Sequence, residues 1–113
     1  MTIVKYGRYV ANMSGTMNNM VQVVDPSSNE AGAVVRTLNM SINGSGSVWL
    51  LTGPTAPIFG TGPNHVVFRV NGNSSMLTGG TLPYEVELPS GYGLWLYASA
   101  AQSSGVNMSY DLY

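Results

Sequence analysis

His65 is the only histidine in the chain, and histidine is the side chain that ordinarily titrates near neutral pH. As a catalytic base it would need a nucleophile and an orienting acid. The sequence contains no Gly-x-Ser-x-Gly motif that would supply the nucleophile. An enzyme would require His65 to lie within hydrogen-bond reach of a serine and a carboxylate. We therefore interpret His65 as a structural residue at the start of a strand, and the sequence predicts a protein that is not an enzyme.

Glu85 and Glu87 are the second candidates for chemistry, because they lie two residues apart on one face of a predicted strand. Their Cβ atoms would be about 7 Å apart. Paired carboxylates could serve glycoside hydrolysis or bind calcium. A strand face exposed to solvent explains them without any chemistry, and we adopt that interpretation. Asp25, Glu30 and Asp111 follow no metal-loop spacing, so neither a metal nor another cofactor is expected.

Charge is scarce throughout the chain. Its 113 residues include four Lys or Arg and five Asp or Glu, whereas 45 are Gly, Ser, Thr or Asn. A typical globular domain is charged at about a quarter of its residues, and surface charge keeps a monomer soluble. We therefore expect this chain to work packed among copies of itself or other proteins. A nucleic-acid partner and an anionic membrane surface are disfavoured, because phosphate binding needs clustered basic residues. The basic residues are Lys5, Arg8, Arg36 and Arg69.

The chain contains no cysteine, so neither disulfides nor thiolate metal sites can form. No apolar stretch approaches the roughly 20 residues of a transmembrane helix. The first residues lack the basic and apolar regions of a secretory signal. The length suits one domain, which we expect to span residues 1–113.

Apolar and polar residues alternate with a period of two along much of the sequence, and this pattern predicts β-strands. Residues 82–88 are the clearest case, because Leu, Tyr, Val and Leu fall on one face. Residues 11–19, rich in Met, Asn, Ser and Gly, are interpreted as a flexible connection or a weak edge. The other predicted strands cover residues 3–10, 20–24, 34–42, 48–52, 65–70, 93–99 and 106–112.

Turn signals separate nearly all of these strands. Asn71-Gly72 is the strongest and predicts a hairpin, while residues 78–80 and 89–93 are also interpreted as turns. About eight short strands with turns between them indicate an all-β fold of two antiparallel sheets packed as a sandwich. Eight strands in two sheets is the number in a jelly roll, which is the architecture we expect. An immunoglobulin-like sandwich is the alternative, although the cysteine pair of true immunoglobulin domains is absent.

Two predicted strands are apolar on both faces. Trp95 and Tyr97 alternate with leucines in one, and Trp49 alternates with Val and Leu in the other. A strand of this kind needs cover on both faces, and only one face can meet the core of the sandwich. The other face must meet a loop, a neighbouring subunit or a ligand. Together with Tyr92, these side chains could also form a platform on which a sugar ring stacks.

Residues 53–63 form the longest predicted break, because three prolines and three glycines there oppose regular structure. Ile58 and Phe59 lie in the middle of this segment. An apolar pair on a rigid loop either covers the core as a lid or contacts a partner, and the sequence leaves both interpretations open.

The tripeptide Asn-Met-Ser occurs three times, at residues 12–14, 39–41 and 107–109. In the second and third copies the methionine falls on the apolar face of a predicted strand. We interpret the repetition as a consequence of strand alternation, not as a duplication.

Four features occur together in the second half of the chain: the alternating strand 82–88, the turn 89–93, the apolar strand 94–97 and an alternating C-terminal strand that ends at Tyr113. With its low charge and its richness in Gly, Ser, Thr and Asn, the whole chain resembles small structural proteins of tailed-phage particles, especially head decoration or cement proteins. The resemblance implies an oligomeric, often trimeric, β-sandwich that bridges capsid subunits. Its partners would be copies of itself and a capsid shell protein. Its location would be the virion, after assembly in the host cytoplasm.

On this expectation, Trp49, Trp95 and Tyr97 bury against sister subunits or the core, the loop residues contact other subunits, and the N-terminal segment 1–9 adds a strand to a neighbour. The main alternative is a carbohydrate-binding domain of a phage tail fibre or baseplate, which would expose the aromatic side chains beside Asn and Asp in a shallow groove. The candidate interface residues are Lys5, Arg8, Trp49, Ile58, Phe59, Tyr92, Trp95 and Tyr97.

Overall fold

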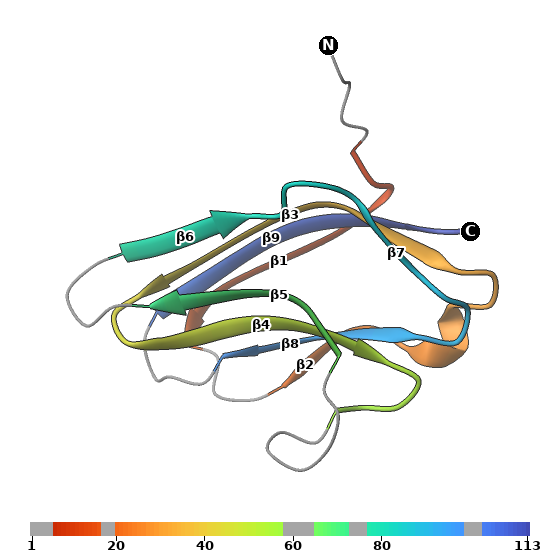
Figure 1. Ribbon diagram of the computed structural model, residues 1–113, viewed down its shortest axis with the longest axis horizontal. Coiled ribbons are helices and arrows are strands. Elements are labelled where there is room, and N and C mark those ends of the chain that lie inside the picture. The colour runs from red at the N-terminus through yellow and green to blue at the C-terminus, as the bar shows by residue number, and fades with distance from the viewer. Residues whose placement is uncertain (1–5, 17–19, 58–64, 73–76, 99–102) are drawn as a thin grey trace.

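The computed structural model describes residues 6–16, 20–57, 65–72, 77–98 and 103–113. Two antiparallel sheets pack face to face, as the sequence predicts (Figure 1). The first sheet has the order β1 (Tyr9–Thr16), β9 (Ser103–Leu112), β3 (Ala33–Asn43) and β6 (Leu77–Thr81), and β7 (Val86–Leu88) also pairs with β3. The second sheet has the order β2 (Val21–Val24), β8 (Gly93–Ala98), β4 (Gly46–Gly53) and β5 (His65–Gly72). A short 3-10 helix, η1 (Pro26–Ser28), follows β2.

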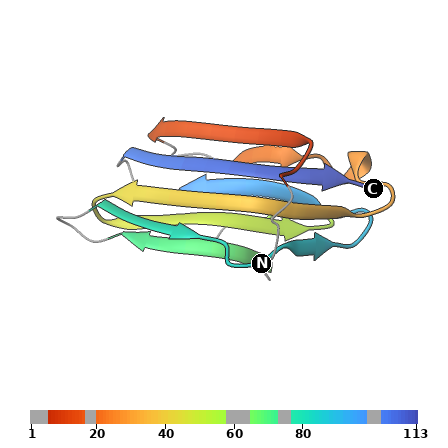
Figure 2. The same ribbon diagram turned by 90° about the horizontal axis from the view of Figure 1, so that it is seen from above.

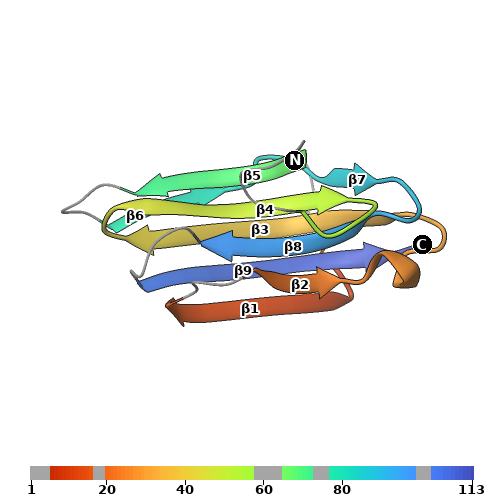
Figure 3. The ribbon, with the colours of Figure 1, turned by 90° about the horizontal axis from the view of Figure 1, so that it is seen from below.

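The strand pairs are nested around β4 and β5. These two strands pair with each other, β3 pairs with β6 and β7, β2 pairs with β8, and β1 pairs with β9. Further pairings of β3 with β9 and of β4 with β8 join the nested pairs into the two sheets (Figures 2 and 3). The register places Tyr9 opposite Tyr110, so the first sheet is complete only when both ends of the described chain are in place.

Alternating residues of the facing strands fill the space between the sheets. A β-bulge between Val35 and Thr37 interrupts the alternation in β3, and Leu38 returns the apolar face to the core. Fully burying one large apolar side chain stabilises a fold by about 1.5–3 kcal/mol. The largest fully buried core side chains include Leu38, Met40, Ile42, Leu50, Leu94, Leu96 and Met108.

The first strand begins later than the sequence predicts. β1 covers Tyr9–Thr16 instead of residues 3–10, and Tyr6–Arg8 precede it without regular structure. Residues 1–5 lie outside the described part of the chain. Of the two interpretations of residues 11–19, the edge strand is therefore the one that the structure shows up to Thr16, because β1 is an edge strand of the first sheet. The sequence shows the apolar–polar alternation of β1 only weakly, because the residue that faces the core there, Ala11, is small, while Asn12 faces outward.

Two predicted turns are instead parts of strands, and glycine at these positions serves close packing. β5 continues to Gly72, and β6 pairs with β3 in the other sheet, so the predicted hairpin at Asn71-Gly72 is wrong. A Cβ atom added to Gly72 would collide with the carbonyl oxygen of Gly44. A Cβ atom added to Gly80 of β6 would lie 3.1 Å from Cγ2 of Val70. Glycine in a strand permits such close approach as well as marking turns.

The predicted strand 82–88 is reduced to β7, Val86–Leu88. Residues 82–85 bend away from β3 after one hydrogen bond of 2.9 Å from Leu82 N to Leu38 O. Pro83 lacks the backbone N–H that a strand ladder needs. Tyr84, which the alternation places on the buried face, is 71% exposed.

Candidate functional site

The outer face of the second sheet brings together several of the predicted interface residues. β4 lies between β5 and β8, so Trp49 has Arg69 on one side and Tyr97 on the other. Trp49 and Tyr97 are half-buried, and Arg69 is exposed. We call Arg69, Trp49 and Tyr97 the aromatic row. Their alignment follows from the strand register, which the sequence alone does not give.

Arg69 is held in place over the indole ring of Trp49. Its guanidinium carbon lies 4.3 Å from the ring centroid, within the range of a cation–π interaction. Its Nε donates a hydrogen bond of 2.7 Å to Oδ1 of Asn71, and the hydroxyl of Ser47 donates to the same oxygen at 2.7 Å. The side of the indole under Arg69 is therefore covered and cannot stack on a sugar ring.

Trp95 belongs to the same outer face but is packed within the chain. It lies opposite Leu51 in the register, and only 3% of Trp95 is exposed. A Cβ atom added to Gly93 would lie 2.7 Å from Cη2 of Trp95 and 2.8 Å from Cδ of Pro26. The indole thus extends over Gly93, close to η1, and offers almost no surface to a partner.

The other predicted interface residues lie apart from the aromatic row. Tyr92 is half-buried against the core at the turn before β8. Arg8 is exposed beside β9, and its backbone N–H donates a hydrogen bond of 2.7 Å to Oδ1 of Asp111. Lys5, Ile58 and Phe59 lie outside the described residues, and their predicted roles stay predictions.

A pocket of about 540 Å³ opens between β5 of the second sheet and β7 of the first. Phe68 and Tyr92 contribute apolar surface to its wall, and Glu87 contributes a carboxylate. Glu85 does not line it, so the two glutamates do not converge there as paired carboxylates. The remaining lining residues are Thr52, Val66, Val67, Leu82, Pro83, Tyr84, Val86, Leu88 and Pro89.

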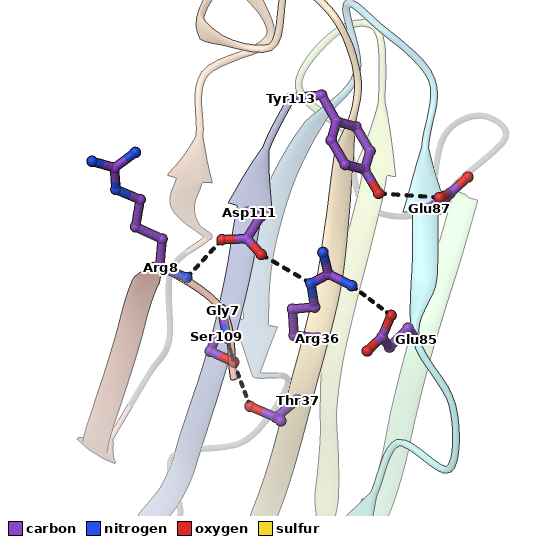
Figure 4. A network of polar contacts seen from close by, with 9 residues as sticks. All are labelled: Gly7, Arg8, Arg36, Thr37, Glu85, Glu87, Ser109, Asp111 and Tyr113. Carbon is purple, nitrogen blue, oxygen red and sulfur yellow. Dashed lines mark hydrogen bonds and ion pairs between the residues drawn. The ribbon is translucent and has the colours of Figure 1, made fainter. Parts of the chain in front are cut away.

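Charged side chains form a network on the outer face of the first sheet (Figure 4). Arg36 is at its centre, donating from Nε to Asp111 at 2.9 Å and from a terminal nitrogen to Glu85 at 2.7 Å. These hydrogen bonds, that to Asp111 first, raise the pKa of Arg36. The hydroxyl of Tyr113 donates to Glu87 at 3.1 Å. Because the network links β3, β7 and both ends of the described chain, we interpret it as a structural clamp.

The clamp extends to the residues that precede β1. The N–H of Gly7 donates a hydrogen bond of 3.0 Å to the hydroxyl of Ser109, which lies 2.6 Å from the hydroxyl of Thr37. A Cβ atom added to Gly7 would collide with the backbone of Tyr110. Gly7 therefore permits the chain to cross close above β9.

Tyr110 is expected to make the fold sensitive to alkali. Burial, followed by the nearby phenol of Tyr9 with its ring centroid 5.4 Å away, raises the pKa of Tyr110. The folded state therefore favours the neutral phenol, and this stabilisation is lost as the pH rises above about 10, where an unfolded tyrosine ionises. Urea denaturation at increasing pH should show a smaller alkaline loss of stability for Tyr110→Phe than for the wild type. An equal loss in both proteins would contradict this assignment.

No group of three or more His, Asp or Glu side chains among the described residues is arranged to hold a metal ion. His65 begins β5, and the surroundings of its side chain lie outside the description. No helix in the described part of the chain is long and apolar enough to cross a membrane. No protein-family model and no curated protein matches this sequence.

Proposed function

We propose that this chain is a non-enzymatic structural protein that decorates or cements a phage particle by associating with copies of itself and with shell subunits. The distribution of charge carries the proposal. Of the nine charged residues, seven lie near the start of β3 or the end of β9: five belong to the clamp, and two lie in the loop that leads from β2 into β3. Lys5 lies outside the described residues, and Arg69 belongs to the aromatic row. The seven are Arg8, Asp25, Glu30, Arg36, Glu85, Glu87 and Asp111.

One charged end, with the rest of both sheet faces nearly neutral, suits a subunit within a larger assembly. The charged end remains in water, where charge favours solubility. The neutral faces can be covered by protein without the cost of removing charges from water. A free monomer gains nothing from leaving most of its surface without charge, so this division supports assembly as the function.

The strand order supports a jelly roll as the finer description of the fold. If β6 and β7 count as one interrupted strand on the edge of β3, eight strands form two sheets of four. Viral capsid and lectin domains share this architecture. Architecture alone therefore does not separate the virion role from carbohydrate binding. Two observations favour the virion role: Arg69 covers one side of Trp49, and Trp95 is buried.

The aromatic row is the surface we assign to contact with neighbouring subunits. Tyrosine and arginine are enriched among the residues that dominate binding at protein interfaces. Tyr97→Ala is expected to weaken self-association by about 2 kcal/mol, roughly thirtyfold. Light scattering at several concentrations, with urea denaturation to establish that the variant is folded, measures this effect.

Tyr84→Ala is the matched control, because it removes an exposed tyrosine that lies outside the aromatic row. Its association should equal that of the wild type. A wild type that stays monomeric at every concentration and is retained by a glycan array would instead support the carbohydrate-binding alternative.

A further inference from the structure

The three Asn-Met-Ser tripeptides lie side by side on three neighbouring strands. Asn12 of β1 is opposite Asn107 of β9, and Asn107 is opposite Asn39 of β3. Thr81 of β6 continues the line beyond Asn39. All four residues are exposed, whereas Met40 and Met108 are buried. Residues far apart in the sequence therefore form one straight row across the first sheet, which we call the amide row.

The neighbouring rows of the same face are small and neutral. Val10, Ser109 and Thr37 form the row on one side of the amide row. On the other side, the register aligns Gly105, Ser41 and Gly79. None of these residues is charged or aromatic, so this part of the face is neutral, and only Ser109 at its edge is covered, by the chain at Gly7.

The amide row adds little to the stability of the chain itself. Asparagine is depleted in strands, where Thr and β-branched residues fit better. Asn39 and Asn107 nevertheless occupy the two interior strands of the sheet. Within the described part of the chain, the side-chain amides of Asn12, Asn39 and Asn107 make no hydrogen bonds, and all three are exposed. Their donors and acceptors face the solvent and are free to bind a partner.

We propose that the amide row is a contact surface for a second copy of this chain, which packs its own amide row against it about a two-fold axis. An amide both donates and accepts hydrogen bonds, so the surface is complementary to itself. Because these rows carry no charge, two identical faces do not repel each other. Small neighbours on the side of Gly105, Ser41 and Gly79 let two sheets approach to about 10 Å, and asparagine ladders stabilise stacked sheets. The rows hold no aromatic ring on which a sugar could stack, which favours a protein partner. This inference rests on the proposed self-assembly and assigns it a second surface.

The contact is expected to be weak in solution. Four strands about 4.8 Å apart and five residues of about 3.3 Å each give a patch of about 300 Å² per copy. The pair would bury about 600 Å², below the roughly 1,200–2,000 Å² of stable specific complexes. Association should therefore depend on concentration, and many copies on one particle would strengthen it through multivalency.

Sedimentation velocity over a wide range of concentrations tests the proposal with Asn107→Asp. This substitution keeps the size of the side chain but places like charges opposite each other across the two-fold axis, and association should weaken at least about tenfold. Ser45→Asp adds the same charge at the exposed β3–β4 turn and should associate like the wild type. Asn107→Thr introduces a better strand former without the amide, so it should fold at least as stably and still associate more weakly.

The outcomes separate this inference from the proposed function. If Tyr97→Ala dissociates the protein while Asn107→Asp leaves its association unchanged, self-assembly stands and the amide row is not the contact. Unchanged association of Asn107→Thr would also overturn the role of the amide. If the wild type stays monomeric and binds immobilised dextran, and Asn107→Asp abolishes that binding, the occupant is a neutral polysaccharide and the second-copy proposal fails.

Discussion

Asn29→Ala is expected to lower the free energy of unfolding by about 3 kcal/mol, because it leaves three backbone groups without their partner. The side-chain nitrogen of Asn29 donates to the carbonyl oxygens of Pro89 and Tyr92, both at 2.9 Å. Its side-chain oxygen accepts from the N–H of Gly32 at 2.8 Å. Only 1% of Asn29 is exposed, so water cannot readily replace these bonds. One buried side chain thus ties the loop between β2 and β3 to the turn before β8.

Urea denaturation of the wild type and the variant measures this loss when the free energy of unfolding falls with urea concentration at the same slope in both proteins. Asn43→Ala is the control, because Asn43 is exposed and lies outside the amide row, so its change should stay within about 0.5 kcal/mol. Asn29→Asp separates the two hydrogen bonds that the side chain of Asn29 donates from the one that it accepts. It keeps the acceptor for Gly32 but removes both donors, so it should be as destabilising as the alanine variant. A loss below about 1 kcal/mol for Asn29→Ala would show that the loop and the turn hold together without it.

The alternation of apolar and polar residues was sufficient to predict the class of fold and most of the strands that enclose the core. It works where large apolar residues face inward on an interior strand, as Leu38, Met40 and Ile42 do in β3. It fails at the edges of the sheets. In β1 the inward residue Ala11 is small, and in β6 the sequence Thr-Gly-Gly reads as a turn although Gly80 packs against Phe68 and Val70. A glycine needed for close approach and a glycine needed for a turn look the same in sequence.

The candidate surfaces depend on which residues of neighbouring strands lie opposite each other. A single sequence does not reveal this strand register. The sequence singled out Trp49 and Tyr97, but it did not pair Trp49 with Arg69, because the two are brought together by the β4–β5 pairing. The three Asn-Met-Ser tripeptides were recognised as alternation and not as neighbours, since β9 joins β1 and β3 only in the folded sheet. Asn29 was not singled out, because two of its three partners, the carbonyl oxygens of Pro89 and Tyr92, lie on a segment that meets it only after folding.

Trp95→Ala is expected to lower the free energy of unfolding by about 3–5 kcal/mol, the range for removing a large buried aromatic side chain. The sequence predicts Trp95 as an interface residue, but its indole is packed over Gly93 in its own chain and is 3% exposed. Loss of the ring would leave a cavity beside η1 and Leu51, which the surrounding strands cannot fill. Urea denaturation measures the effect, and circular dichroism in the absence of urea shows whether the variant folds.

Tyr97→Ala is the matched comparison, because Tyr97 lies on the same strand and the same face as Trp95 but is only half-buried. We expect Tyr97→Ala to lose less stability than Trp95→Ala and to lose more association. The two variants thus separate folding from assembly on one strand. If Trp95→Ala keeps a free energy of unfolding within about 1 kcal/mol of the wild type and yet no longer associates, Trp95 acts at an interface. In that case its indole must leave its place over Gly93 to reach a partner. The contact surface would then include Trp95 as well as the aromatic row.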